Sequence, residues 1–123
     1  MTSPNYIILY VDNPTVSTHF YAHLLEKSPV HNSPTFSLFA LDSGLKFGLW
    51  AKHEVEPATG MSGGGSELVF SVADRDAVDA MHADWARRGI IIAQTPTVMD
   101  FGYTFTAVDP DGHRLRVCSL SAA

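Results

Sequence analysis

The chain repeats one passage of its own sequence, and this repeat constrains the fold more than any other feature. The passage reads Asn-Tyr-Ile-Ile-Leu-Tyr-Val-Asp over 5–12 and Glu-Leu-Val-Phe-Ser-Val-Ala-Asp over 67–74, which is 62 positions later. Each copy is an apolar run that predicts a strand, followed by an acidic turn and an amphipathic stretch that predicts a helix. The sequence therefore predicts two half-domains of one design, whose matching residues face a shared space.

Capping and turn residues place the other elements of the first half. Asn13 is a predicted helix cap, and Pro14 suits the first helical position because its missing N–H costs nothing there. Strands are expected at 35–41 and 45–51, joined by the hairpin turn at 42–44. The apolar stripe of the helix is expected to hold Val16, Phe20, Tyr21, Leu24 and Leu25.

The second half follows the same order after a glycine-rich connector at 62–66. Asp74 is the expected helix cap, and Gly89 is the expected left-handed residue that ends the helix. Further strands are expected at 90–93, 103–108 and 114–120, with a Thr- and Pro-rich loop after the first and the turn Asp109-Pro110-Asp111-Gly112 between the last two.

Length and charge limit the possible classes of protein. A chain of 123 residues with 46% hydrophobic content predicts one domain over 1–123, with modules at about 5–60 and 66–120. A net charge of −5 without a basic run argues against a nucleic-acid or membrane partner. The single Cys118 excludes an internal disulfide, and the lack of a signal peptide favours a cytoplasmic location.

The order of elements resembles that of the vicinal oxygen chelate superfamily, which contains glyoxalase I, extradiol dioxygenases and the fosfomycin and bleomycin resistance proteins. The resemblance is carried by Asp-Pro-Asp-Gly-His-Arg-Leu-Arg at 109–116 and by Val11-Asp12 with Phe20-Tyr21. It implies an α+β fold of two βαβββ modules, whose sheets curl around a cavity. It also implies a homodimer, with the modules paired within one chain or swapped between two.

A branch of this superfamily offers a nearer resemblance. The stretches 45–50, 101–105 and 109–118 are similar to those of phenazine-antibiotic resistance proteins, which sequester a griseoluteate-type phenazine without changing it chemically. This resemblance implies a binding protein with no catalytic residues and no cofactor.

Metal-dependent members of the superfamily hold a divalent ion at four strand positions, which fall here on Asn5, Gly48, Glu67 and Arg116. Glycine has no side chain, and arginine has no lone pair to donate and would repel a cation. One carboxylate does not hold a catalytic ion, so we expect no metal. Glu67 and Arg116 are expected to pair with each other, or Arg116 is expected to bind the carboxylate of a ligand.

Aromatic and hydroxyl side chains complete the candidate site. Strand alternation places Trp50 on the same face as Gly48, where a flat wall would suit a planar ligand. Phe39 and Phe101 are further candidates for stacking. The superfamily pattern implies that Thr104, Thr106, Arg114 and Arg116 face the cavity, and that Tyr103 and Phe105 back onto the helices.

The leading hypothesis is therefore a non-enzymatic protein that sequesters a planar aromatic compound, an antibiotic or toxic metabolite. The alternative is a metal-dependent lyase, isomerase or dioxygenase of the same superfamily, with metal ligands from other positions. A third possibility is an interaction module whose cavity is filled by its own side chains.

Overall fold

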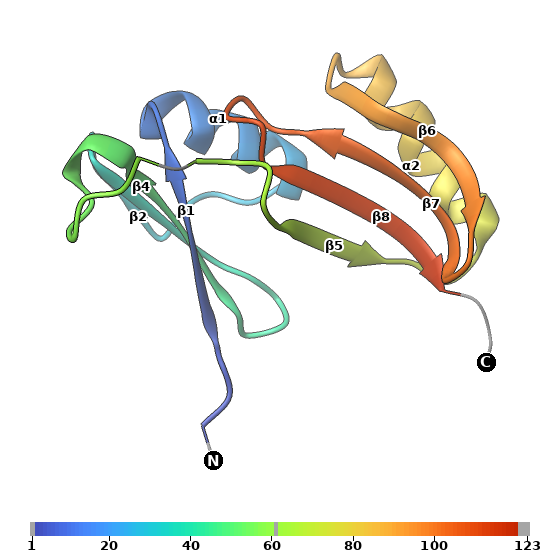
Figure 1. Ribbon diagram of the computed structural model, residues 1–123, viewed down its shortest axis with the longest axis horizontal. Helices are drawn as coiled ribbons and strands as arrows, with labels where there is room; N and C mark the ends of the chain where they lie inside the picture. The colour runs from blue at the N-terminus through green and yellow to red at the C-terminus, as the bar shows by residue number, and fades with distance from the viewer. Residues whose placement is uncertain (1, 61, 121–123) are drawn as a thin grey trace. The chain divides into compact units, whose positions relative to one another are not determined.

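The structure is a computed structural model that describes residues 2–60 and 62–120. The chain divides into two compact units, and the boundary along the chain lies between Gly63 and Gly64. Each unit combines one α-helix with a four-stranded mixed sheet (Figure 1). The predicted α+β fold with two βαβββ modules is confirmed, and the dimer stays a prediction.

The first unit has its strands in the order β1-β4-β3-β2. β1 and β4 are parallel, whereas the β4–β3 and β3–β2 pairs are antiparallel. The helix α1 packs against β3 and β4 on one face of this sheet. The elements are β1 (Tyr6–Val11), α1 (Pro14–Leu25), β2 (His31–Asn32), β3 (Phe36–Ala40), β4 (Lys46–Ala51) and the short 3₁₀ helix η1 (Lys52–Glu54).

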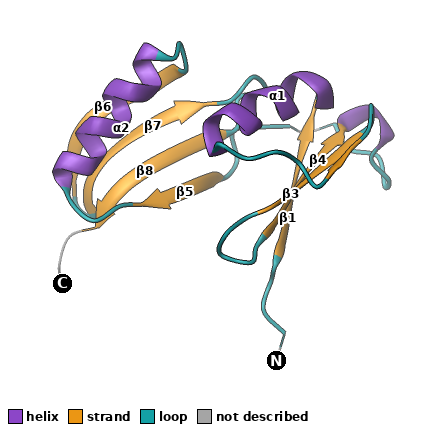
Figure 2. Ribbon diagram, turned by 180° about the vertical axis from the view of Figure 1, so that it is seen from behind, coloured by secondary structure: helices purple, strands orange, loops and turns teal. Residues whose placement is uncertain are grey.

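The second unit repeats this topology in the order β5-β8-β7-β6, with β5 and β8 parallel. Its helix α2 lies across one face of the sheet and packs on β6, β7 and β8 (Figure 2). Neither of the α-helices in the described parts of the chain is long and apolar enough to cross a membrane. The elements are β5 (Glu67–Ser71), α2 (Arg75–Arg87), β6 (Ile91–Met99), β7 (Gly102–Val108) and β8 (Arg114–Leu120).

The repeat is real, but its offset is 61 positions, not the 62 predicted from the apolar runs. The helix caps Asn13 and Asp74 are 61 positions apart, as are the first strand residues Tyr6 and Glu67. Glu67 therefore matches Tyr6 and not Asn5. A shift of one residue moves a strand side chain to the opposite face of its sheet, so the predicted equivalence of Asn5 and Glu67 was wrong.

Both predicted helix starts are confirmed by their side-chain caps. The Oδ1 atom of Asn13 accepts hydrogen bonds from the backbone N–H groups of Thr15 and Val16. The carboxylate of Asp74 accepts one from the N–H of Ala77. These bonds satisfy amide groups that have no partner within the helix, which stabilises each first turn.

The predicted apolar stripe of α1 was partly wrong. Val16 is 50% exposed, whereas Ser17, Thr18 and Tyr21 are buried. The Thr18 hydroxyl donates to the Ser37 hydroxyl at 2.7 Å, and Tyr21 packs edge-on against another buried ring of the sheet. Hydroxyl groups are tolerated in this core because each has a hydrogen-bond partner, which a hydrophobicity pattern does not reveal.

The Thr- and Pro-rich segment after residue 93 was predicted as a loop, but β6 continues through it to Met99. The β6–β7 register shifts between Ile92 and Gln94 and again between Gln94 and Thr97. β6 is an edge strand, so Pro96 breaks no ladder between two neighbours. The irregular register explains why the strand has no simple alternation in its sequence.

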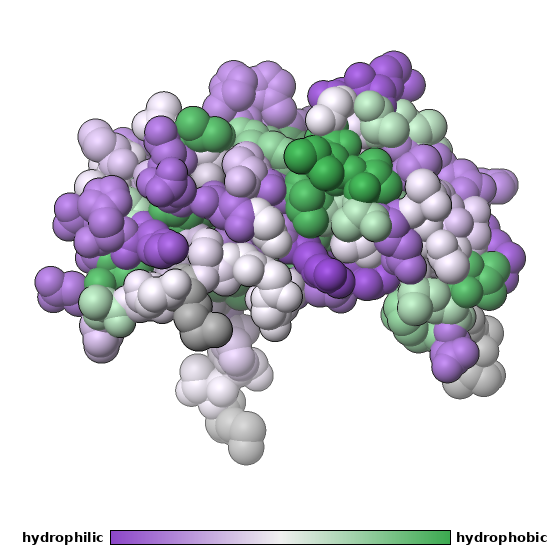
Figure 3. Space-filling view, turned by 45° about the horizontal axis from the view of Figure 1, so that its top comes forward, coloured by the Kyte–Doolittle hydropathy of each residue, from purple (hydrophilic) through white to green (hydrophobic). Residues whose placement is uncertain are grey.

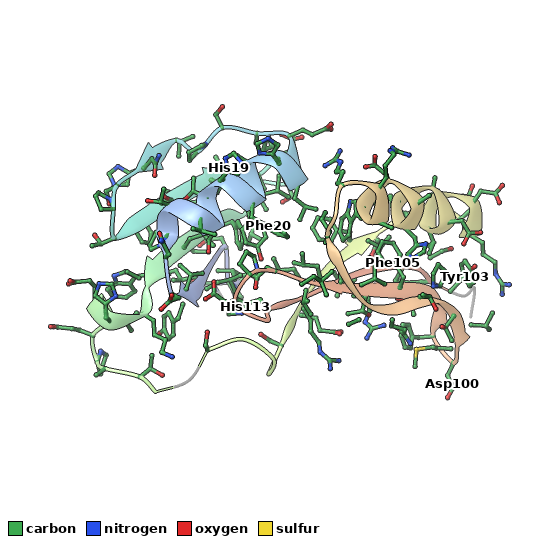
Figure 4. All side chains as sticks on the ribbon, turned by 90° about the horizontal axis from the view of Figure 1, so that it is seen from above. His19, Phe20, Asp100, Tyr103, Phe105 and His113 are labelled. Atoms are coloured by element: carbon green, nitrogen blue, oxygen red, sulfur yellow. The ribbon has the colours of Figure 1, made fainter. Side chains whose placement is uncertain are left out.

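The predicted turn at 109–112 is confirmed. The buried carboxylate of Asp109 accepts hydrogen bonds from the N–H groups of Asp111 and His113 at 2.8 and 2.9 Å. Figure 4 labels His113 where the chain leaves this turn for β8. Asp109 therefore has a structural role that orders the β7–β8 hairpin.

Gly102 generates a prediction about stability. Its φ is +150°, and a Cβ atom at this position would lie 2.1 Å from the backbone oxygen of Ser119. We expect Gly102→Ala to lower the free energy of unfolding by about 2–4 kcal/mol, because the β7–β8 backbones must separate. Urea denaturation followed by circular dichroism measures this change.

Gly44→Ala is the matched control. Gly44 also has a positive φ, +93°, but its Cβ atom would meet nothing within 4 Å. Only backbone strain of about 1–2 kcal/mol is expected there. Equal losses in the two variants would contradict the role assigned to the close β7–β8 approach.

Candidate functional site

Each sheet has one face that packs on its own helix and one that points away from it. In the first unit, we call the face that points away from the helix the aromatic face. The register aligns Ile8, Gly48 and Leu38 across β1, β4 and β3, with Tyr10 and Phe36 flanking Trp50 in the adjacent row. The aromatic face consists of Tyr6, Ile8, Tyr10, His31, Phe36, Leu38, Ala40, Lys46, Gly48 and Trp50.

Gly48 lies in the middle strand of the aromatic face, with rings directly over its backbone. A Cβ atom at Gly48 would lie 3.0 Å from the ring of Phe36 and 3.3 Å from the ring of Tyr6. Trp50 meets Tyr10 edge-on, with ring centroids 6.3 Å apart. The space that was predicted beside Gly48 is therefore taken by neighbouring aromatic side chains, which the absent side chain of Gly48 allows to sit close to the sheet.

Two predicted site residues do not lie on the aromatic face. Phe39 is fully buried and packs against Phe47, whose ring contacts Tyr21 of α1. Its neighbour Leu38 takes the face of Gly48, so alternation turns Phe39 toward the helix. Asn5 precedes β1, and its backbone oxygen accepts a hydrogen bond from the N–H of Lys46.

The corresponding face of the second unit, which we call the polar face, is a hydrogen-bonded network around Arg116. The Nε atom of Arg116 donates to both carboxylate oxygens of Glu67 at 2.9 and 3.1 Å, and Nη2 donates to Oε2 at 2.9 Å. Nη1 donates to the Thr104 hydroxyl and to Oε1 of Gln94. The Thr106 hydroxyl donates to the same Oε1 atom. The predicted pairing of Glu67 with Arg116 is confirmed.

The ion pair alters the proton affinity of both partners. The hydrogen bonds from Arg116 lower the pKa of Glu67, against the opposing effect of partial burial, and the positive charges of Arg116 and Arg114 lower it further. The same hydrogen bonds raise the pKa of Arg116. Glu67 therefore stays ionised at neutral pH, and the positive charge of Arg116 is already compensated within the protein.

Aromatic residues of β7 and the preceding turn lie on opposite sides of the second sheet. The guanidinium carbon of Arg116 is 5.7 Å from the ring centroid of Phe101, which is 42% exposed. Tyr103 and Phe105 face α2 instead, as predicted (Figure 4). Tyr103 donates its hydroxyl to Asp79 at 2.7 Å, which raises the pKa of the phenol.

The four predicted metal positions, Asn5, Gly48, Glu67 and Arg116, do not offer a donor set here. Gly48 has no side chain, and Arg116 is a cation whose hydrogen bonds hold Glu67, the one carboxylate among the four. Within the described ranges, no three His, Cys, Asp or Glu side chains are grouped so that they could hold an ion. A divalent ion at Glu67 would have to displace Arg116 and would be repelled by it.

Sequence reasoning missed three rings of the aromatic face and one amide of the polar face. Tyr6 and Tyr10 could have been found by alternation along β1, once its register with β4 was known. Phe36 lies directly across from Trp50 in β3. Gln94 had no signal, because it lies between the two register shifts of β6.

Apolar residues reach the surface in several separate areas, drawn in green in Figure 3.

Comparison with known families identifies the class of the protein. Residues 3–117 match the model of the Glyoxalase/Bleomycin resistance protein/Dioxygenase superfamily. The chain belongs to this superfamily, and the predicted resemblance is confirmed.

Individual relatives place it more narrowly. The phenazine antibiotic resistance protein EhpR of Enterobacter agglomerans is 33% identical over 121 residues, which cover 96% of this chain and 92% of EhpR. Protein ATC0852 of Agrobacterium tumefaciens, known from a solution NMR structure, is 53% identical and has a TM-score of 0.91, with 99% of this chain and all of that chain covered. A glyoxalase/bleomycin resistance protein/dioxygenase from Nocardioides has a TM-score of 0.84 at 17% identity. The match covers 98% of this chain and 84% of that one, so the two proteins share the fold.

The lowered pKa of Glu67 predicts a pH-dependent contribution to stability. Because the folded pKa lies below the unfolded one, the stabilisation is complete above the ordinary glutamate pKa and is lost as pH falls through the folded pKa. We expect Glu67→Gln to cost about 1–2 kcal/mol at about pH 6 and clearly less at about pH 3. Urea denaturation at the two pH values measures the difference.

Glu56→Gln is the control for net charge, because Glu56 is exposed and lies in the first unit. A loss in Glu67→Gln that is the same at both pH values would show that the ion pair does not supply the stabilisation.

Proposed function

We propose that this protein binds a planar aromatic compound of the phenazine class and gives resistance to it by sequestration. The observation that carries the proposal is the aromatic face, where Tyr6, Tyr10, Phe36 and Trp50 surround a glycine at the middle of a sheet. A flat ligand needs flat apolar partners, and these side chains provide them from three adjacent strands.

The rings of the aromatic face have the exposure that stacking requires. Tyr6 is 39% exposed, and Trp50 and Phe36 are half-buried, so their rings are held by neighbours but are not enclosed in the core. Tyrosine and tryptophan lose little conformational entropy on binding and bring large apolar surfaces. Stacking on such rings is tolerant of ring substituents, which suits a resistance protein.

The relative EhpR supports the chemical class of the ligand. It is named as a phenazine antibiotic resistance protein, and the similarity extends over almost the whole of both chains. Because the alignment spans both units, the comparison does not depend on a single motif.

Three side chains of chemically reactive types have structural roles. Glu67 is held by Arg116, Asp109 orders a turn, and Cys118 is buried in the sheet. These roles support binding without turnover.

Trp50 provides the direct test of stacking. Trp50→Ala is expected to weaken the binding of a phenazine by about 1–3 kcal/mol, because the ligand loses a large apolar partner. Trp50→Phe keeps a ring and should retain most of the affinity. Isothermal titration calorimetry measures both without relying on tryptophan emission.

Val30→Ala is the control for loss of an exposed apolar side chain, since Val30 is 66% exposed and lies outside the aromatic face. Unchanged affinity in Trp50→Ala, with the protein still folded, would remove Trp50 from the site.

Sequestration also predicts that binding does not depend on metal. Dialysis of the protein against EDTA should leave the dissociation constant for a phenazine unchanged, because no ligand contact in the proposal passes through an ion. Calorimetry before and after dialysis tests this. Affinity that disappears with EDTA and returns with a divalent ion would favour the metal-dependent alternative.

A further inference from the structure

The charge on the aromatic face identifies a residue that sets ligand specificity, an inference that deepens the proposed function and rests on it. We propose that Lys46 binds the anionic substituent of a planar aromatic acid. The ring system of the ligand then stacks toward Trp50, and its carboxylate points to the Lys46 end of β4. All the residues concerned lie in the first unit.

The first observation is the position of Lys46 on the central strand of the aromatic face. Lys46, Gly48 and Trp50 lie on this face, because they alternate with residues that are buried on the helix side. Successive positions on one face of a strand are about 6.7 Å apart, which places Trp50 and Lys46 about 13 Å apart along β4. A three-ring compound with a carboxylate at one end can therefore lie along this strand, with its rings at Trp50 and its anionic end at Lys46.

The second observation is that the ammonium group of Lys46 is available to a ligand. The side chain is exposed, and no carboxylate in the described parts of the chain forms an ion pair with it. Lys27, by contrast, is held by Asp42. An incoming carboxylate thus meets an uncompensated positive charge at Lys46 and does not have to displace a carboxylate of the protein.

The third observation is that the aromatic face differs in charge from the chain as a whole. None of its residues, all of which lie in described strands, is Asp or Glu, although the chain has a net charge of −5. His31 is the other basic side chain of the face. It lies two strands away from Gly48, with its ring tilted against Phe36. A carboxylate at Lys46 therefore meets no like charge on this face.

The neighbours of Lys46 suit a ligand that lies along β4. In the register, Tyr6 of β1 and Ala40 of β3 stand on either side of Lys46. The ring of Tyr6 leans toward Gly48, 3.3 Å from the position that a Cβ atom would take there. A planar ligand over this ring would bring its edge to the ammonium group and shield the contact partly from water, which strengthens the attraction between opposite charges. Because Lys46 is exposed before binding, the gain in affinity is modest.

The test compares phenazine-2-carboxylate with phenazine-2-carboxamide, which share a ring system and differ in charge at neutral pH. We expect the unchanged protein to bind the carboxylate about fivefold more tightly at low salt. The preference should shrink at about 0.5 M salt, because salt screens exposed charges. Lys46→Gln should remove the preference without changing the affinity for the carboxamide, whereas Lys46→Arg keeps the cation and should keep the preference. Isothermal titration calorimetry gives each constant.

Two control variants test where the charge acts. Lys52→Gln removes the same charge beyond the other end of β4, and His31→Gln removes the other basic side chain of the aromatic face. Both variants should still prefer the carboxylate. Loss of the preference in either of them, or its persistence in Lys46→Gln, would overturn the role assigned to Lys46.

The outcomes for the unchanged protein separate this inference from the proposed function. Equal affinities for the two compounds, or tighter binding of the carboxamide, would overturn the inference and leave the proposed function standing. Failure to bind either compound would overturn the proposed function itself, together with this inference.

Discussion

The parallel pairing of the first strand of each unit with the last one is the constraint on which the rest of the structure depends. It places β4 between β1 and β3, and β8 between β5 and β7. Each residue of these two central strands therefore has a paired strand on both sides. Because side chains alternate between the faces of a sheet, this register alone decides which residues pack on the helix and which form the candidate site.

The two units use equivalent positions for opposite purposes. Gly48 and Arg116 hold the same place in the central strands, facing Ile8 and Val69 across the parallel pair. Glycine lets the rings of Phe36 and Tyr6 lie on the sheet, whereas arginine gathers a carboxylate, an amide and a hydroxyl around itself. The same fold thus provides an aromatic wall in one unit and a compensated polar network in the other.

Much of this arrangement could be predicted from the sequence, because caps and turns are local chemistry. Asn13, Asp74 and the turn at 109–112 act within a few residues of themselves, and each was placed correctly. The pairing of Glu67 with Arg116 was one of the two roles predicted for Arg116, the other being contact with the carboxylate of a ligand. The superfamily and the repeated module were recognised from the order of the predicted elements and from local motifs such as the turn at 109–112.

The failures concern register, which depends on contacts between distant parts of the chain. A repeat aligned one residue out placed Asn5 where Tyr6 belongs, although the 61-residue spacing of the predicted caps Asn13 and Asp74 was a local signal of the slip. Phe39 was assigned to the site because alternation gives two faces without saying which one meets the helix. Thr18 entered the core through a hydrogen bond to Ser37 that exists only once α1 has docked on β3.

The measurement that tests the account most directly is an NMR titration of isotopically labelled protein with a neutral phenazine. A ring stacked on the aromatic face should produce large ring-current shifts at the amide of Gly48 and the indole of Trp50, with saturation at stoichiometric ligand. Saturable shifts confined to α1 and the buried side of its sheet, or no shift near Gly48, would contradict the claim that this face binds the ligand.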